Sequence, residues 1–312
     1  MSISNIISFD IEDWFHPEIF GDRFPQHKWN QLESRVKQST EIILDFLSKR
    51  NLNATFFFLG WIAENYPEIV KIAAEAGHEI GVHGYTHTRI DALAPDEFRD
   101  EVKLSISILE SITAKKVLGF RAPTFSITKK TLWALPILLD QGLSYDSSVF
   151  PIYHDRYGIP DAPIIPYEIY KSGKKSLVEF PMSTIQICQY RFPLGGGGYF
   201  RLYPFWLTKK FMKKCQREKR AVIFYAHPWE FDLDLPRVDL STFGRIRHYY
   251  AINKFLERLS VITDLFEFTS FEKSSLWESV SSLENDDINY NAELVSHTIE
   301  TGEKKQARYV SK

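Results

Sequence analysis

Residues 54–82, ATFFFLGWIAENYPEIVKIAAEAGHEIGV, contain one complete strand–helix–strand unit. The apolar run Ala54–Leu59 is rich in aromatic residues and predicts a buried strand. Pro67–Ala76 predicts a helix, with proline in its first turn and Gly77 directly after its end. His78–Val82 then returns to a short strand. A unit of this kind is typical of a parallel sheet covered by helices.

The same alternation extends to both sides of this unit. Before it, Ile6–Asp10 predicts a strand that runs into an acidic turn, and Glu33–Ser48 predicts an amphipathic helix. After it we expect, in order, the helix Pro95–Ile112, the strand Val117–Phe120, the helix Lys129–Gln141 and the strand Ser144–Asp146. The sequence therefore predicts an α/β fold of strand–helix repeats. Its acidic and histidine-rich segments follow strands, where such folds place their active sites.

Between Phe150 and Pro204 this pattern is replaced by a segment rich in proline, glycine and tyrosine. We interpret it as a strand-rich insertion, not a separate domain, and expect these later elements: strands Ile164–Ile169, Leu177–Phe180, Thr184–Ile187, Ala221–Ala226 and Leu265–Thr269, and helices Leu207–Arg217 and Ile252–Leu259. We therefore expect one domain over residues 1–275, of which 150–275 is an elaboration. The polar segment 276–312 predicts a disordered tail.

Composition excludes several classes of protein. The 312 residues include 38 Lys and Arg against 40 Asp and Glu, a formal net charge of −2. This balance argues against a nucleic-acid-binding protein and against a polybasic membrane-surface module. Two cysteines, Cys188 and Cys215, are too few for a disulfide framework. The sequence shows no signal peptide and no apolar run of about 20 residues, so we expect a cytoplasmic protein without membrane insertion.

Two motifs predict a metal site. Gly81–His87, GVHGYTH, places His83 and His87 four residues apart after a strand, so both can face one ion if the chain turns. Phe9–Asp13, FDIED, places three carboxylates within four positions, and a cation would neutralise their repulsion. Each motif alone is weak, because an acidic turn can be merely solvated. Together they supply the carboxylate and histidine ligands of a catalytic zinc ion.

Three further segments end predicted strands with polar residues. Arg121 follows the strand of GFRAP, where it can hold a carboxylate ionised, although a surface salt bridge is the alternative. Asp146 lies in YDSS, and His227 ends the apolar strand of IFYAHPWE. A histidine held by a carboxylate such as Asp146 stays cationic, as a general acid must. A satisfied core histidine is the alternative.

These five segments, in this order, resemble the polysaccharide deacetylases of carbohydrate esterase family 4. The resemblance covers roughly residues 5–230. The extended motifs FDIEDWFHPEIF, YDSSVFPIYHDRYGIP, HPWEFD and GRIRHYY resemble a subgroup that accompanies exopolysaccharide biosynthesis loci. The resemblance implies a distorted (β/α) barrel of the polysaccharide-deacetylase type and a divalent metal ion, usually zinc, with cobalt or nickel as alternatives.

The resemblance also implies a role for each motif residue. Asp10 would be the general base, Arg121 would orient it, His227 would be the general acid and Asp146 its partner. His83 and His87 would be metal ligands. The family usually has two adjacent aspartates, whereas here Ile11 follows Asp10. The third ligand is therefore Glu12 or Asp13, and strand alternation favours Glu12.

Aromatic residues near these motifs are candidates for sugar contacts. Thr124 follows Pro123 where many relatives have an aromatic residue, so Phe125 is expected to supply that wall. We take Pro123, Phe125, Tyr199 and Trp229 as candidate substrate-binding residues, with ordinary packing as the alternative. The run Gly195–Gly198 lets backbone approach a neighbour closely, or is simply flexible. Basic residues around Arg247 could meet an anionic sugar or a lipid diphosphate, and a solvated helix face is the alternative.

The sequence thus predicts a metal-dependent hydrolase that removes acetyl groups, foremost N-acetyl, from a polysaccharide or a lipid-linked oligosaccharide. Its partner would be an acetylated carbohydrate. Two alternatives stay open: an allantoinase-like amidohydrolase on a non-sugar amide, and a non-catalytic carbohydrate-binding relative. The sugar, its linkage and the oligomeric state are not indicated by the sequence.

Overall fold

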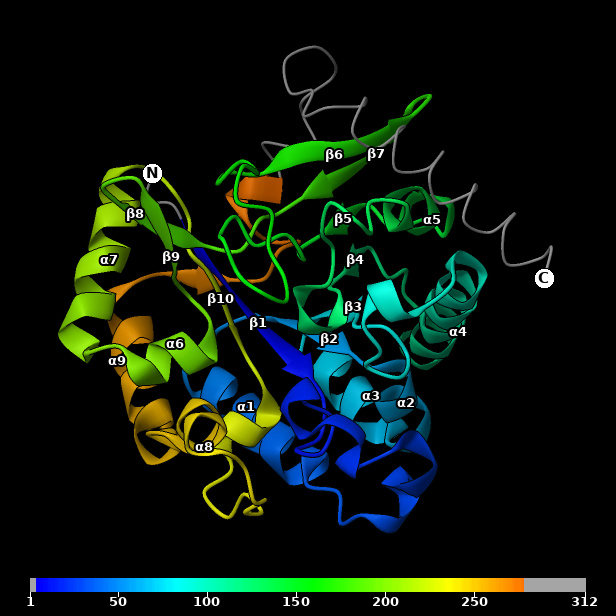
Figure 1. Ribbon diagram of the computed structural model, residues 1–312, viewed down its shortest axis with the longest axis horizontal. Coiled ribbons are helices and arrows are strands. Elements are labelled where there is room, and N and C mark those ends of the chain that lie inside the picture. The colour runs from blue at the N-terminus through cyan, green and yellow to red at the C-terminus, as the bar shows by residue number, and fades with distance from the viewer. Residues whose placement is uncertain (1–3, 278–312) are drawn as a thin grey trace.

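The computed structural model describes residues 4–277, which form a curved, largely parallel sheet with helices packed around its outside (Figure 1). The strand order is β10-β1-β2-β3-β4-β5-β7-β6, with β11 also pairing to β1. The strands are β1 (Asn5–Ile11), β2 (Thr55–Phe58), β3 (Glu79–Val82), β4 (Gly119–Phe120), β5 (Tyr145–Asp146), β6 (Tyr167–Ser172), β7 (Lys175–Glu179), β8 (Thr184–Ile187), β9 (Tyr190–Pro193), β10 (Ile223–Ala226) and β11 (Phe268–Thr269). The expected α/β fold is confirmed.

The helices follow the expected alternation. They are α1 (Val36–Lys49), α2 (Gly60–Asn65), α3 (Pro67–Glu75), α4 (Pro95–Thr113), α5 (Ala134–Asp140), α6 (Gly197–Leu202), α7 (Phe205–Arg217), α8 (Thr242–Tyr249) and α9 (Phe255–Leu265). Helix α5 begins later than the predicted Lys129, because the Thr131 hydroxyl bonds the Ser126 carbonyl and accepts from the Thr128 amide, which fixes a turn there.

Strand β1 lies between β10 and β2, so it has a neighbouring strand on each side. All seven of its residues are buried, and Phe9 pairs with Ala226 of β10 on one side and Phe56 of β2 on the other. Parallel strands covered on both faces are apolar along their length, which explains the phenylalanine-rich run of β2. Two acidic side chains, Asp10 and Glu12, interrupt this apolar pattern near the end of β1. Buried carboxylates of this kind require polar or charged partners.

The barrel is closed by loop contacts. Among residues 4–277 no ladder joins β7 to β10. The gap is filled by the chain around the β8–β9 hairpin: the Ile223 amide donates to the Ser183 hydroxyl at 2.7 Å, and the Tyr225 amide donates to the Gly195 carbonyl at 2.9 Å. This interruption is the distortion of the barrel, and the strand-rich insertion supplies the segment that fills it.

The glycine run has a structural explanation. Gly195 has φ +93°, and a Cβ on Gly197 would lie 2.0 Å from the Glu230 carboxylate. Gly196 forms a bridge to Tyr225. Gly195–Gly197 thus bring the start of α6 against β10 and its following turn, whereas Gly198 lines the cleft.

Two further expectations concern the chain as a whole. The predicted disordered tail falls almost entirely on residues 278–312, outside the described residues. Within the described part of the chain, no helix has both the length and the apolar character needed to cross a membrane. Cys188 is exposed, Cys215 is buried, and both are free thiols.

Candidate metal centre and cleft

Asp10 is held by a buried arginine. Both side chains are almost fully buried, and Arg121 Nη1 donates to Asp10 Oδ1 at 2.8 Å. The same nitrogen donates to the Ser8 hydroxyl, and Nε donates to the Ser147 carbonyl at 3.0 Å. The guanidinium also lies 4.4 Å from the centre of the Phe57 ring. Arg121 therefore has one fixed position, and it orients the Asp10 carboxylate and compensates its charge.

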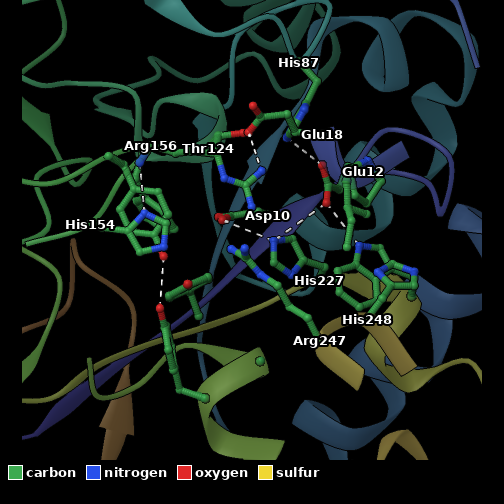
Figure 2. Close-up of a pocket in the computed structure, with 18 of the residues that line it drawn as sticks. Asp10, Glu12, Glu18, His87, Thr124, His154, Arg156, His227, Arg247 and His248 are labelled. Atoms are coloured by element: carbon green, nitrogen blue, oxygen red, sulfur yellow. Dashed lines mark hydrogen bonds and ion pairs between the residues drawn. The ribbon is translucent and has the colours of Figure 1, made fainter. Parts of the chain in front are cut away.

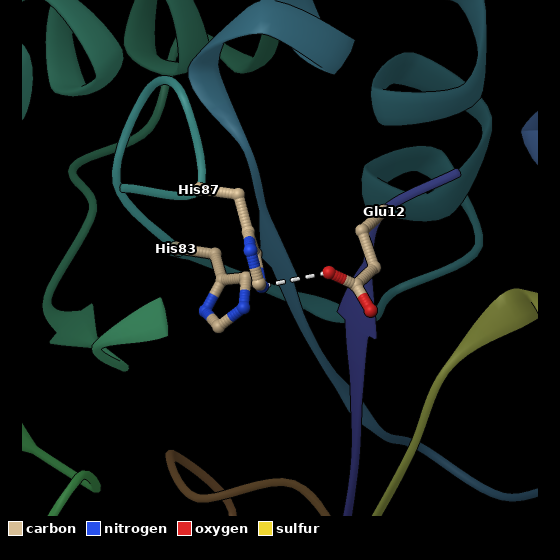
Figure 3. Close-up of side chains that lie close together, drawn as sticks. All are labelled: Glu12, His83 and His87. Atoms are coloured by element: carbon tan, nitrogen blue, oxygen red, sulfur yellow. Dashed lines mark ion pairs between the residues drawn. The ribbon is translucent and has the colours of Figure 1, made fainter. Parts of the chain in front are cut away.

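Glu12, His83 and His87 form a compact group of ligand atoms (Figure 3). One atom from each lies within 4.8 Å of the others, and His87 Nε2 is 2.8 Å from Glu12 Oε2. The residues come from the end of β1 and from the turn after β3. His87 has φ +56° and Gly84 has φ +76°, and these left-handed residues bend the chain back so that both imidazoles face Glu12.

The imidazole of His83 is prepared for ligation. Its Nδ1 lies 2.8 Å from the carbonyl of Arg121, so Nδ1 carries the proton and Nε2 keeps a free lone pair. Burial lowers the pKa of His83 to about 4, which keeps the ring neutral. A neutral histidine fixed through its second nitrogen is the usual arrangement of a metal ligand. With one carboxylate and two imidazoles, the donor set fits zinc or a similar divalent ion.

Asp13, the other candidate for the third ligand, is turned away from this group. Its carboxylate accepts from the Ser34 hydroxyl and from the amides of Trp14, Arg35 and Val36. It therefore satisfies the free amides at the start of α1, as a capping residue does. Of the two alternatives, the structure brings only Glu12 to the histidines.

His227 faces the same group from the end of β10 (Figure 2). Its Nε2 lies 3.7 Å from Glu12 Oε1 and 4.0 Å from Asp10 Oδ2. Its Nδ1 lies 3.2 Å from Glu230, which Arg201 also contacts at 2.8 Å. Burial opposes the charge on the ring, but Glu12, Glu230 and Asp10 outweigh it and raise the pKa of His227 to about 9.

The expected pairing of Asp146 with His227 is wrong. Asp146 is fully buried at the end of β5, where it accepts from the Ser148 hydroxyl and contacts Glu179 of β7. Burial raises the pKa of both carboxyls, that of Asp146 to about 6, so the pair retains a proton. The residue that holds His227 is Glu230, three positions along the chain. Sequence reasoning missed it, although the spacing His-x-x-Glu before a short helix is a capping-box signal.

A cleft of about 320 Å³ opens above the metal ligands (Figure 2). Phe125, Tyr199 and Trp229, three of the four expected substrate-binding residues, line it. Pro123 does not line it: its ring lies under Gly84, 3.3 Å from where a Cβ would be, and so supports the histidine turn.

Trp229 connects the metal ligands with the cleft wall. Its indole N–H donates to Glu12 Oε1 at 3.1 Å. Its ring stacks on His227 at 4.9 Å and on His248 of α8 at 4.4 Å. Trp229 therefore orients the candidate ligand Glu12 and the imidazole of His227. The sequence predicted only a sugar contact for this residue.

Parts of this chain are similar to known proteins. Residues 28–138 match the model of the polysaccharide deacetylase family, and residues 147–275 match a domain of unknown function, DUF3473. A peptidoglycan deacetylase of Helicobacter pylori is 32% identical over 120 residues, which are 37% of this chain and 40% of that protein. A peptidoglycan-N-acetylglucosamine deacetylase of Bacillus cereus is 38% identical over 96 residues, 30% of this chain and 35% of that protein. The matches thus span well under half of these relatives.

The fold has a solved counterpart over nearly its whole length. A Mycobacterium smegmatis crystal structure, described as a polysaccharide deacetylase, superposes with a TM-score of 0.62 and 19% identity, covering 93% of this chain and 95% of that one. At this identity the likeness concerns the fold. The family models match two successive parts of the chain: residues 28–138 match the polysaccharide deacetylase family, and residues 147–275 match DUF3473.

Proposed function

We propose that this protein is a metal-dependent hydrolase that removes acetyl groups from amino-sugar nitrogens. The proposal is carried by one observation: the Glu12, His83 and His87 ligand group lies beside both the Asp10–Arg121 pair and the His227–Glu230 pair. A carboxylate base and an imidazolium acid on two sides of a metal site are the groups that amide hydrolysis requires.

The residues of the chain have distinct tasks in this reaction. Glu12, His83 and His87 would hold the ion, for which we propose zinc, with cobalt or nickel as alternatives. A bound ion lowers the pKa of water and polarises the acetyl carbonyl. Asp10, oriented by Arg121, takes the proton of the attacking water. His227, held by Glu230, donates a proton to the departing sugar nitrogen, which is a poor leaving group without it.

The cleft supports a carbohydrate substrate. Its apolar wall is formed by aromatic rings, including those of Phe125 and Tyr199, which suit the faces of sugar rings. We further propose that the substrate is a polysaccharide or a lipid-linked oligosaccharide of exopolysaccharide biosynthesis. The support for this pathway is the resemblance of the extended sequence motifs.

Acetate release tests the proposal. The purified full chain is incubated with oligomers of N-acetylglucosamine, peptidoglycan fragments and lipid-linked acetylated oligosaccharides, before and after chelation. We expect acetate from at least one of these, loss of release with chelator, and recovery with added zinc. Ureides such as allantoin serve as the non-sugar arm. Release that persists in chelator, or hydrolysis of ureides alone, would overturn the proposal.

A further inference from the structure

Helix α8, from the DUF3473 region, turns one face toward the cleft. Phe243, Ile246 and Arg247 lie three and four positions apart, so they share a face, and all three line the cavity. The next residue, His248, is buried behind them against Trp229. The segment around Arg156, also from this region, lines the cleft as well. Residues outside the polysaccharide deacetylase match thus add cationic groups to its cleft.

The arginines near the cleft differ in their partners. Arg121 binds Asp10, Arg201 binds Glu230 at 2.8 Å, and Arg156 lies 3.7 Å from Glu18. The guanidinium of Arg247 has no hydrogen bond or ion pair to any residue between 4 and 277. Figure 2 shows its side chain projecting from α8 into the cleft.

Arg247 is held in place through its backbone. Its carbonyl accepts from Arg201 Nη2 at 3.2 Å, and the Tyr250 carbonyl accepts from Arg201 Nη1 at 2.6 Å. Arg201 is buried and is itself fixed by Glu230. The end of α8 is therefore anchored to the same carboxylate that holds His227, which fixes the backbone from which the Arg247 side chain extends.

A half-buried guanidinium without a partner, in a cleft with a mainly apolar lining, is suited to bind an anion from outside the chain. Partial removal from water is unfavourable for a charge without a partner. The planar fork of arginine matches the two oxygens of a carboxylate or a phosphate. Arg247 and Arg156 both act on His154 and Tyr157, so their positive fields overlap at one wall of the cleft. Glu18 lies 3.7 Å from Arg156 and 3.8 Å from Arg89, and no carboxylate among residues 4–277 lies within ion-pair distance of Arg247.

We propose that Arg247, supported by Arg156, forms a subsite for an anionic group of the substrate, a carboxylate or a phosphate on the sugar chain next to the residue that is deacetylated. This inference rests on the proposed function for the identity of the reaction and goes beyond it in naming an acidic carbohydrate as the substrate class.

The test measures binding and turnover separately. Three acetylated probes are compared: a neutral oligomer of N-acetylglucosamine, an oligomer of the same length that alternates glucuronate with N-acetylglucosamine, and N-acetylglucosamine 1-phosphate. Arg247→Gln is compared with Arg245→Gln, which removes the same charge from the same helix at an exposed position outside the cleft. Affinities are measured by titration calorimetry on the zinc-loaded full chain, and deacetylation is measured by acetate release.

We expect Arg247→Gln to weaken binding of at least one anionic probe by about tenfold or more, the loss of one charge-assisted hydrogen bond. Binding of the neutral oligomer and all properties of Arg245→Gln should change less than about twofold. The response of the glucuronate and phosphate probes tells which anion is recognised. Equal affinities of wild type and Arg247→Gln for both anionic probes would overturn the subsite, whatever the activity. Absence of acetate release from every probe, with anion binding still dependent on Arg247, would instead count against the proposed reaction.

Discussion

Two pairs of carboxyl groups lie at the ends of strands in the same sheet, and different groups surround them. The carboxyls of one pair contact an arginine and a histidine, whereas those of the other pair contact each other. Asp10, near the end of β1, faces Arg121, and Glu12, directly after β1, faces His87. Asp146 and Glu179, at the ends of β5 and β7, face each other, and burial raises the pKa of both. Position at the end of a strand is therefore not enough to assign a carboxylate the role that we propose for Asp10 or Glu12, and the charged groups beside it must be known as well.

The largest effect is expected for Asp10. Replacing Asp10 by Asn keeps the shape and removes the base, so acetate release should fall by at least about 100-fold. Zinc should still bind, because Asp10 is not one of the three ligands. The checks are acetate release and metal content after dialysis. A fully active Asp10→Asn variant would show that another group takes the proton.

Substitutions of the neighbouring carboxylates Glu12 and Asp13 should have different effects: one on zinc affinity and the other on the free energy of unfolding. Glu12→Gln should weaken zinc binding by more than about 100-fold. Loss of a residue that only hydrogen-bonds to a metal ligand already lowers metal affinity by about 10-fold to 100-fold, and loss of a ligand should lower it further. Asp13→Ala should leave zinc affinity unchanged and cost about 1–2 kcal/mol of unfolding free energy, because the first amides of α1 lose their acceptor. Competition with a zinc-binding dye and urea unfolding measure the two. Reversed effects would assign the ligand role to Asp13.

Glu230 and Asp146 test which carboxylate serves His227. Glu230→Gln should reduce kcat by about 10-fold to 100-fold, the loss of one hydrogen bond to a charged group. Asp146→Asn should change kcat less than about threefold, as it has no contact with His227 among the described residues.

Glu230→Gln also leaves the buried Arg201 without its anion, so a control must separate activity from folding. The double variant Arg201→Gln/Glu230→Gln removes both charges and should recover thermal stability while kcat stays low. Recovery of activity together with stability would mean that Glu230 acts only through the fold.

The smallest effect is expected at the Asp146–Glu179 pair. In the folded state burial raises the pKa of Asp146 to about 6 from 3.8, and that of Glu179 well above 4.5. Carboxyls with raised pKa values stabilise the fold fully below about pH 4, and this contribution is lost as the pH rises through 6. Glu179→Gln supplies a permanent amide donor to Asp146, so it should gain about 1–2 kcal/mol over wild type at pH 8 and little at pH 4. The free energy of unfolding in urea is measured for both proteins as a function of pH. The same difference between them at pH 4 and at pH 8 would contradict the prediction.

The sequence predicted the fold and the residues of the candidate metal site because both depend on local patterns. Short apolar strands ending in Asp10, Glu12, His83 and His227 identify the sheet and its active edge. The partner of His227 was mispredicted because Asp146 and Glu230 are both acidic and near strand ends, and only the packing of β5 against β7 shows that Asp146 faces Glu179. Asp13 caps the start of α1, and the sequence did not predict this role. The cap depends on where α1 begins in space, which the spacing of charged residues does not reveal.

The pairing of β1 with the much later strand β10 has a consequence for synthesis on the ribosome. The Ser8 hydroxyl bonds the carbonyl of Phe224 in β10, 216 residues later. At ordinary translation speeds of about 5–20 residues per second, roughly 10 to 40 seconds separate the two strands. During this time one edge of the strand that carries Asp10 and Glu12 lacks its partner and is open to pairing with other chains. A chain that stops before β10 therefore lacks His227 and one neighbour of β1, so the candidate site is complete only when nearly the whole described fold has been made.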